Sequence, residues 1–409
     1  MSTPLFRSFF LGGFECSSHR LRNGRRLDLL ASSGHERHLA ADYRRLREAG
    51  IRTAREGLRW HRIEVAPGRY DWSSVLPMVR CARDSGIQVI WDLFHYGWPD
   101  GLDPFRPEFV TRLARLARGF AELLREETDE PPFVSPVNEI SFVAWASGSV
   151  AYMNPFARGR GDELKVQLVR AAVECVNEIR DVSPAARFMH PDPLIHVVAS
   201  PKRPWERPAA ARHRQAQFES WDMLSGRAWP WLGGRPDVLD VVGVNYYADN
   251  QWVHGGRHIT RFHPMYRPLR HLLIDVHERY RRPVLIAETG IEGHERPEWL
   301  RYVGREARAA MRAGVAIQGI CLYPVVAYPG WDDGRICHCG LWGPPDASGR
   351  RKIHAPLAEE LRRQQRAFDA YLRSAALRTD VVSAGARAAA AAAGPAAGRS
   401  RAAAAPWSP

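Results

Sequence analysis

Two glutamates in this chain stand at the ends of short apolar runs, where a pair of carboxylates could share one site. Glu139 closes the run 133–138, and Glu288 closes the run 283–287. Each run follows or begins with a proline and is typical of a buried strand with a polar tip. Two facing carboxylates, one an acid and the other a base or nucleophile, are the groups that cleave a glycosidic bond. An ordinary solvated glutamate is the alternative for either residue alone.

The remainder of the chain alternates strands with helices, which decides whether the two glutamates can meet. Besides the runs that end at Glu139 and Glu288, apolar runs predict strands at 9–16, 51–58, 87–94, 187–190, 238–247 and 315–323. Apolar spacing and caps predict helices at 35–49, 71–84, 107–126, 163–181, 212–225, 268–280, 297–313 and 355–373. A strand followed by a helix, repeated in this way, predicts an α/β fold, a (β/α)8 TIM barrel. A doubly wound open sheet is the alternative.

In such a barrel the side chains at the C-terminal tips of the strands converge on one site. Besides the two glutamates, the residues at or near these predicted tips are Arg55, His95, Asn138, Asn245, Tyr247, Tyr323 and Trp331. Hydrogen-bonding groups and aromatic rings suit a sugar, whose hydroxyls need directional partners and whose C–H faces pack on rings. We therefore expect a carbohydrate substrate.

Several motifs resemble those of glycoside hydrolase family 1, the β-glucosidase type within the clan of (β/α)8 retaining hydrolases. Residues 138–140 (Asn-Glu-Ile) and 287–290 (Ala-Glu-Thr-Gly) are similar to the family's Asn-Glu-Pro and Thr-Glu-Asn-Gly motifs. Further similar segments are 54–63, 95–99, 245–247, 340–342 and 351–353. The resemblance covers about residues 9–373 in the same order, with enough departures to make the chain a divergent member.

The resemblance implies a retaining β-glycosidase that works by double displacement and needs neither a cofactor nor a metal. Glu288 would attack the anomeric carbon, while Glu139 would act first as the acid and then as the base. Arg55 would keep Glu288 ionised, and the charge of Glu288 would raise the pKa of Glu139. The expected sugar contacts are Asn138, His95 and, as a platform, Trp331.

The residues expected to hold the sugar depart from the family pattern. The family's first-strand Gln has no clear counterpart here, so Glu15 or His19 would have to serve. The Glu that grips the outer sugar hydroxyls aligns with Gly330, and Asp332 or Asp333 could replace it through a small loop shift. We therefore expect weak activity on simple gluco- and galactosides, and a natural sugar that is bulkier or differently substituted.

Two other functions fit parts of the pattern. A family-1-like barrel that binds glycans with little or no turnover is one, because the residues around the sugar are altered. A barrel aldolase is the other, but that chemistry needs a Schiff-base lysine at a strand tip. The three lysines, Lys165, Lys202 and Lys352, lie elsewhere, which disfavours the aldolase.

Charge and cysteine content point to few partners besides the substrate. The net charge of +13 comes from 58 basic and 45 acidic residues, and all but three of the basic residues are arginines scattered along the chain. We attribute this to compositional bias and expect no nucleic-acid partner. The chain lacks a signal-peptide pattern and a membrane-spanning run, and its six cysteines lack a disulfide framework, so we expect a cytoplasmic protein. The oligomeric state does not follow from the sequence.

The composition changes near the C-terminus. Residues 376–409 are rich in Ala, Gly, Pro and Arg and have no amphipathic period. Such a segment cannot bury enough apolar surface to fold. We therefore expect one catalytic domain at 1–375 and a disordered tail at 376–409.

Overall fold

Eight parallel strands close into a barrel with the strand order β1-β12-β11-β9-β7-β6-β5-β2. The computed structural model describes the backbone of residues 4–392 and the side chains of residues 4–375. The barrel strands are β1 (Phe10–Gly13), β2 (Thr53–Gly57), β5 (Gln88–Phe94), β6 (Phe133–Val137), β7 (Arg187–Pro193), β9 (Val241–Asn245), β11 (Val284–Thr289) and β12 (Ile317–Leu322). The closed barrel confirms the predicted α/β fold, a (β/α)8 TIM barrel, and shows that the open sheet is wrong.

The barrel strands are apolar along nearly their whole length because helices cover them outside and side chains fill the interior. In β5 every residue after Gln88 is buried. Its partners are β2 on one side, with Arg55 opposite Ile90, and β6 on the other, with Phe133 opposite Ile90. This parallel register brings the C-terminal tips of the strands to one end of the barrel.

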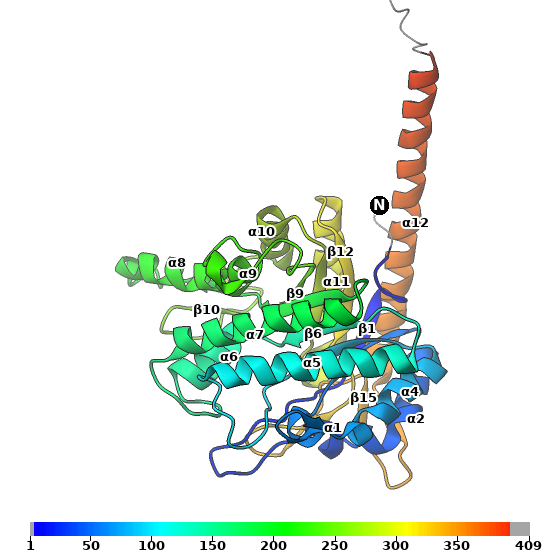
Figure 1. Cartoon of the computed structure of the whole chain (residues 1–409). Helices are drawn as coiled ribbons and strands as arrows, with labels where there is room; N and C mark the ends of the chain where they lie inside the picture. Colours follow the sequence, from blue (N-terminus) through cyan, green and yellow to red (C-terminus); the bar gives the residue numbers. More distant parts are fainter. Residues whose placement is uncertain (1–3, 393–409) are drawn as a thin grey trace, which may run out of the picture. The chain divides into compact units, whose positions relative to one another are not determined.

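Long amphipathic helices form the outer layer. The longest within the barrel unit, α5 and α7, lie side by side outside β6 (Figure 1). In α5, Phe109, Leu113, Leu116 and Phe120 are buried at helical spacing. The larger helices are α2 (His35–Glu48), α4 (Leu76–Ser85), α5 (Pro107–Glu127), α7 (Gly161–Val182), α8 (Arg207–Ala216), α9 (Glu219–Leu224), α10 (Leu269–Tyr280), α11 (Arg296–Arg312) and α12 (Ala355–Ala392). One apolar face on each helix is what packing against a barrel requires.

Short helices and strands lie between the main elements along the chain. The short helices are α1 (Leu29–Ser32), α3 (Trp60–Ile63) and α6 (Ile140–Val143), and α6 continues into a π-helix, η2 (Ala144–Ser149). The additional strands are β3 (Glu64–Ala66), β4 (Arg69–Tyr70), β8 (His196–Val198), β10 (Gln251–Val253), β13 (Tyr328–Pro329), β14 (Ile336–Cys337), β15 (Trp342–Pro345) and β16 (Arg351–Ile353). These strands pair two by two as β3 with β4, β8 with β10, β13 with β14 and β15 with β16.

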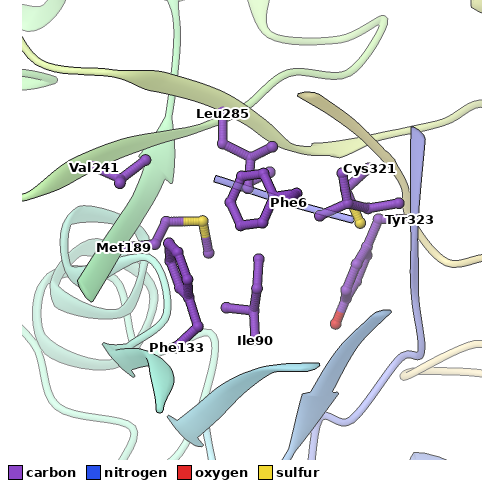
Figure 2. Packing of buried hydrophobic residues seen from close by; sticks show 10 residues of the cluster. Phe6, Ile90, Phe133, Met189, Val241, Leu285, Cys321 and Tyr323 are labelled. Atoms are coloured by element: carbon purple, nitrogen blue, oxygen red, sulfur yellow. The ribbon is translucent and has the colours of Figure 1, made fainter. Parts of the chain in front are cut away.

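Apolar side chains fill the barrel interior (Figure 2). Phe6, from the segment before β1, lies among them and packs on Phe133 with ring centroids 5.0 Å apart. The cluster comprises Phe6, Leu11, Ile90, Phe133, Met189, Val241, Leu285, Ala287, Cys321 and Tyr323. Since Tyr323 follows the last strand of the barrel, β12, the packed interior reaches the C-terminal end of the barrel. The barrel is therefore a filled core with a floor beneath its C-terminal face.

The barrel belongs to a compact unit that spans Pro4–Gln365. The last helix, α12, runs to Ala392, beyond the helix predicted at 355–373. The predicted disordered tail spans 376–409. Its side chains lie outside the described residues, as does the backbone of residues 393–409. All six cysteines are free thiols. Within the described residues, no helix has the length and apolar character that crossing a membrane requires.

Candidate active site

A cavity of about 540 Å³ opens at the C-terminal face of the barrel. The predicted site residues that line it are His95, Glu139, Tyr247, Glu288, Tyr323 and Trp331. Arg55, Asn138 and Asn245 are fully buried and hydrogen-bond to lining residues. All the predicted site residues therefore lie around a single cavity, as expected for strand tips of a barrel.

Glu139 is buried, and the side chains that hydrogen-bond to its carboxyl group are neutral. Its backbone is left-handed, with φ 51° and ψ 59°, between β6 and α6, and its N–H donates to the Pro191 carbonyl at 3.0 Å. Its carboxyl accepts hydrogen bonds from the Tyr96 hydroxyl and, at 2.9 Å, from the Asn245 amide. Burial and the charge of Glu288 raise the pKa of Glu139 to about 8, against the opposing effect of these two hydrogen bonds.

Glu288 is held by a cation instead. Arg55 donates from Nη1 to Glu288 Oε1 at 2.7 Å, and the Tyr247 hydroxyl donates to Oε2 at 2.8 Å. Hydrogen bonds and an opposite charge favour the ionised form of a carboxyl group. Glu288 is therefore paired with a cation, whereas Glu139 accepts its hydrogen bonds from the neutral side chains of Tyr96 and Asn245.

Arg55 is the centre of a buried polar network. Its guanidinium also pairs with Asp92, with Nη2 2.8 Å from Oδ2, and donates from Nη2 to Asn138 Oδ1 at 2.7 Å. Asn138 in turn donates from Nδ2 to the Tyr96 hydroxyl at 2.9 Å, leaving that hydroxyl to donate to Glu139. A continuous chain of hydrogen bonds therefore runs from the cation that holds Glu288 to the carboxyl group of Glu139.

His95 is oriented by two neighbours. Its Nδ1 lies 3.0 Å from Asp92 Oδ2, and its Nε2 lies 3.2 Å from Asn138 Nδ2. Because the Asn138 amide donates, Nε2 is assigned as the acceptor and Nδ1 as the protonated nitrogen. The imidazole also stacks on Tyr323, with centroids 6.0 Å apart and an interplanar angle of 7°. The His95 ring is therefore fixed at the cavity wall.

Aromatic rings form another part of the wall. Trp331 packs edge-on against Tyr96, with centroids 5.6 Å apart, and lies 6.4 Å from the Phe142 ring. Tyr323 lies deeper, beneath the Arg55 guanidinium at 5.1 Å. Trp331 therefore packs on other aromatic rings of the wall, whereas Tyr323 packs on Arg55 and His95.

Of the residues considered as replacements for the missing sugar contacts, Glu15 lines the cavity. His19 lies against the edge of Trp331, with centroids 5.0 Å apart, and lines a neighbouring cavity instead. Asp332 accepts from the Tyr152 hydroxyl at 3.0 Å, and Asp333 accepts from the Arg335 N–H at 3.0 Å. Neither aspartate lines the cavity that holds Glu139 and Glu288.

Two residues of the network were not among the predicted site residues. Asp92 lies within β5, and its one sequence signal is a carboxylate inside an otherwise apolar strand. Burial raises its pKa, but Arg55 and His95 outweigh burial and lower it overall. Tyr96 reaches Glu139 from a left-handed backbone with φ 71°, which sequence patterns do not reveal for a tyrosine.

A possible metal-ligand group occurs beside the network. Within the described residues, one atom each from Cys16, Asp92 and His95 lie within 4.8 Å of one another. Asp92, however, is paired with Arg55, and its second contact is the His95 imidazole. A guanidinium already neutralises the carboxylate, so this group fits structural support of Arg55 better than metal binding.

A second cavity of about 500 Å³ adjoins the first and shares Phe142 and Pro193 with it. Trp145, Ile195 and Trp252 also line this second cavity. Its surface is mainly apolar, so an apolar space lies next to the cavity that holds the carboxyl groups.

No protein-family model and no curated protein matches the sequence. Solved structures are similar in fold. A family 1 β-glucosidase from Thermotoga maritima has a TM-score of 0.68 at 16% identity, over 82% of this chain and 87% of that chain. The β-glucosidase from Thermotoga maritima in complex with glucoimidazole has a TM-score of 0.73 at 16% identity, over 88% of this chain and 98% of that chain. A hyperthermophilic β-glucosidase mutant has a TM-score of 0.69 at 15% identity, over 88% of this chain and 100% of that chain. The chain therefore has the fold of these β-glucosidases, which confirms the resemblance at the level of structure.

Proposed function

We propose that this chain is a divergent member of glycoside hydrolase family 1, a retaining β-glycosidase that hydrolyses O-glycosidic bonds through a covalent glycosyl-enzyme. The observation that carries the proposal is the pair of unlike carboxyl groups in one cavity. Glu139 has a pKa raised to about 8, so it holds a proton at neutral pH, while Glu288 is paired with Arg55. A protonated acid and a nucleophile that is paired with a cation are what the first step of this reaction needs.

In the first step, an oxygen of Glu288 forms a bond to the anomeric carbon as the bond to the leaving oxygen breaks. The proton of Glu139 moves onto that oxygen, so the leaving group departs as a neutral alcohol. The negative charge of Glu288 is then consumed in the ester. Its loss removes one of the causes that raise the pKa of Glu139.

The second step uses the same groups in reverse order. Glu139, now ionised, takes a proton from water as the water oxygen attacks the anomeric carbon, and Glu288 departs as a carboxylate. Arg55, 2.7 Å from Glu288, stabilises the returning negative charge. The Tyr96 and Asn245 hydrogen bonds stabilise the ionised Glu139.

The stereochemistry of the product tests the proposed reaction. We expect an aryl β-glycoside to release the β-anomer of the free sugar first, followed by mutarotation, as observed by ¹H NMR. Retention corresponds to carboxyl groups about 5–5.5 Å apart, and inversion to roughly 6.5–9.5 Å. Release of the α-anomer would overturn the double displacement. Tight glycan binding without turnover of any activated glycoside would instead favour the barrel that only binds.

Substitution of the two glutamates tests their separate roles. With an activated aryl glycoside, Glu139→Ala should accumulate the glycosyl-enzyme, seen by mass spectrometry, and added azide should release a β-glycosyl azide. Its kcat/KM on a poor leaving group should fall roughly 10²–10⁴-fold. Glu288→Gly should lose about 10⁴-fold or more, the order of loss when an enzyme's nucleophile is removed. Azide should then restore cleavage from the opposite face.

Asp332→Asn is the matched control, because this carboxylate binds Tyr152 outside the catalytic cavity. It should retain activity within about threefold, the range of a surface substitution. Near wild-type turnover in both glutamate variants would show that the assignment is wrong.

A further inference from the structure

The catalytic cavity is acidic although the protein is strongly basic. Its titratable lining includes the carboxylates Glu15, Glu139, Asp249, Glu288 and Glu292. Neither a lysine nor an arginine is among the residues that line this cavity in the described part of the chain. Since the whole chain has a net charge of +13, the sign of the cavity departs from that of the molecule around it. A cavity lined by one sign of charge concentrates ligands of the opposite sign.

Part of this negative charge is already compensated. Arg55 pairs with Glu288 from beneath but also serves Asp92, so one cation is shared by two carboxylates. Glu292 pairs with Arg335 at 2.5 Å, outside the cavity lining. The pKa of Glu139, raised to about 8 by burial and by Glu288, keeps that group neutral at pH 7. The carboxylates without a cation are therefore Glu15 and the exposed Asp249.

Glu15 is the buried one of these two. It is 5% exposed, and its Oε1 accepts the Ser17 N–H at 3.0 Å as well as the Ser17 hydroxyl. The same Oε1 lies 3.9 Å from His95 Nε2, which has no proton to donate in the tautomer assigned above. Within the described residues, Oε2 of Glu15 accepts no hydrogen bond. Burial raises the pKa of Glu15, against the opposing effects of His95 and of the Ser17 hydrogen bonds, so a cation beside the second oxygen would stabilise the ionised form.

We propose that the sugar of the natural substrate carries an amine, and that its ammonium group binds Glu15 inside the catalytic cavity. The substrate class is then an amino-sugar β-glycoside, an inference that rests on the proposed function for its hydrolysis. An ammonium offers three donors and a full charge, whereas a hydroxyl offers one donor and no charge. Tyr323, Tyr328 and Trp331 line the same cavity, and aromatic faces add to the attraction of a cation.

A neutral sugar does not require a buried carboxylate at position 15. For neutral hydroxyls, an amide at position 15 supplies both a donor and an acceptor without the desolvation cost of a charge. Replacement by Gln therefore separates the two cases. If Glu15 serves hydroxyls, Glu15→Gln should bind a neutral glycoside as well as or better than the wild type. If Glu15 serves an ammonium, the same variant should lose affinity only for the amino sugar.

Binding can be measured without turnover. The probes are 4-nitrophenyl 1-thio-β-D-glucopyranoside and its four counterparts with an amine in place of the hydroxyl at carbon 2, 3, 4 or 6. By calorimetry at pH 7, we expect at least one amino thioglycoside to bind the full-length protein tenfold or more tightly than the parent. Glu15→Gln should reduce that preference at least tenfold and change the Kd of the parent less than threefold.

Two further variants keep the result interpretable. Glu15→Asp keeps the charge with a shorter side chain, so part of the preference should remain. Asp249→Asn removes an exposed carboxylate from the same cavity and should reduce the preference less than threefold, since exposed charges are screened. Thermal unfolding of each variant shows whether it folds.

The inference is overturned if no amino thioglycoside binds more tightly than the parent, or if Glu15→Gln weakens all ligands equally while folding normally. The proposed function has a different point of failure. A preference for the amine that depends on Glu15, with no hydrolysis of the matching O-glycosides, would leave the ligand assignment standing and remove the glycosidase. Retaining hydrolysis of the neutral glycoside with no preference for an amine would support the glycosidase and remove the ligand assignment.

Discussion

The protonation state of Glu139 depends on its burial and on neighbouring groups that act in opposite directions. Burial and the charge of Glu288 raise its pKa, while hydrogen bonds from Tyr96 and Asn245 lower it. The balance leaves a pKa of about 8, well above the ordinary value of 4.5. A general acid with such a pKa is protonated through neutral pH and still close enough to it to act as a base afterwards.

This balance predicts the pH dependence of catalysis and the effect of Tyr96→Phe. We expect kcat/KM for a poorly activated glycoside to fall above about pH 8, as Glu139 loses its proton. Tyr96→Phe removes a hydrogen bond that lowers this pKa, so the alkaline limb should move to higher pH. Tyr152→Phe, which loses a hydroxyl bonded to Asp332 outside the cavity, is the control and should leave the limb in place. A downward movement in Tyr96→Phe would contradict this account.

The predicted site residues share a property that sequence patterns reveal. Glu139, Asn245 and Glu288 stand where apolar runs end, and a barrel brings such ends together. Asp92 and Tyr96 lack that signature, because one lies inside a strand and the other depends on a left-handed backbone. Position along the chain therefore predicted which groups meet, but not which neighbours orient them.

The packing of α2 against β2 contains a buried ionic cluster. His35 in α2 has Nδ1 2.9 Å from Asp42 Oδ2 and Nε2 2.9 Å from Glu56 Oε1 in β2. Arg351 in β16 also pairs with Asp42, from Nε to Oδ1 at 2.8 Å. Burial opposes protonation of His35, but Glu56 and Asp42 outweigh it and raise its pKa to about 9. The charged imidazole thus links α2 to β2, and Asp42 in turn links α2 to Arg351 in β16.

The free energy of unfolding should therefore depend on pH through His35. Because the folded pKa of about 9 exceeds the unfolded value of 6.5, this contribution is fully present below pH 6.5. It is lost progressively as the pH rises through 9, and a difference of one in pKa is worth about 1.4 kcal/mol. Urea unfolding between pH 6 and 9.5 should show the decline, and His35→Gln should lower stability and flatten this part of the profile. An unchanged slope in the variant would exclude His35 as the cause.

One predicted helix differs from the structure because tertiary contacts override its local sequence pattern. The predicted helix at 212–225 is in fact two helices, α8 and α9. Between them, Gln217 accepts the Ile195 N–H at 2.8 Å and Phe218 is buried. Helical propensity depends on local sequence and contains no information about contacts with a distant segment. The break between α8 and α9 could therefore not be predicted. The strong amphipathic period of α5, in contrast, placed its start at Pro107 correctly.

The barrel interior holds a hydrophobic cluster to which several strands contribute. Phe6, which comes from outside the strands, completes this core by packing on Phe133 (Figure 2). The apolar runs predicted a filled barrel, whereas the role of Phe6 depends on where the first residues fold back. The segment before β1 is too short to show a hydrophobic periodicity, so the sequence does not predict that Phe6 enters the barrel.

Truncation of Phe6 should destabilise the whole barrel. Phe6→Ala removes a buried ring and leaves a cavity, so we expect a loss of about 3–5 kcal/mol in the free energy of unfolding. The matched control is Phe262→Ala, because Phe262 is 88% exposed and should change stability by less than about 0.5 kcal/mol. Chemical denaturation of both variants measures the difference. Equal effects would mean that Phe6 is dispensable for the core.

The apolar cavity that shares Phe142 and Pro193 with the cavity around Glu139 and Glu288 bears on the fate of the proposed glycosyl-enzyme. Once the leaving group has departed, an apolar alcohol gains more than water from occupying this space, because burial of its apolar surface is favourable. Such alcohols should compete with water as acceptors of the sugar. We expect benzyl alcohol to divert a larger share of the sugar into a new β-glycoside than glycerol does at equal concentration, as measured by chromatography. The same wall would then make the protein a synthetic catalyst as well as a hydrolytic one, with the choice set by the polarity of the acceptor.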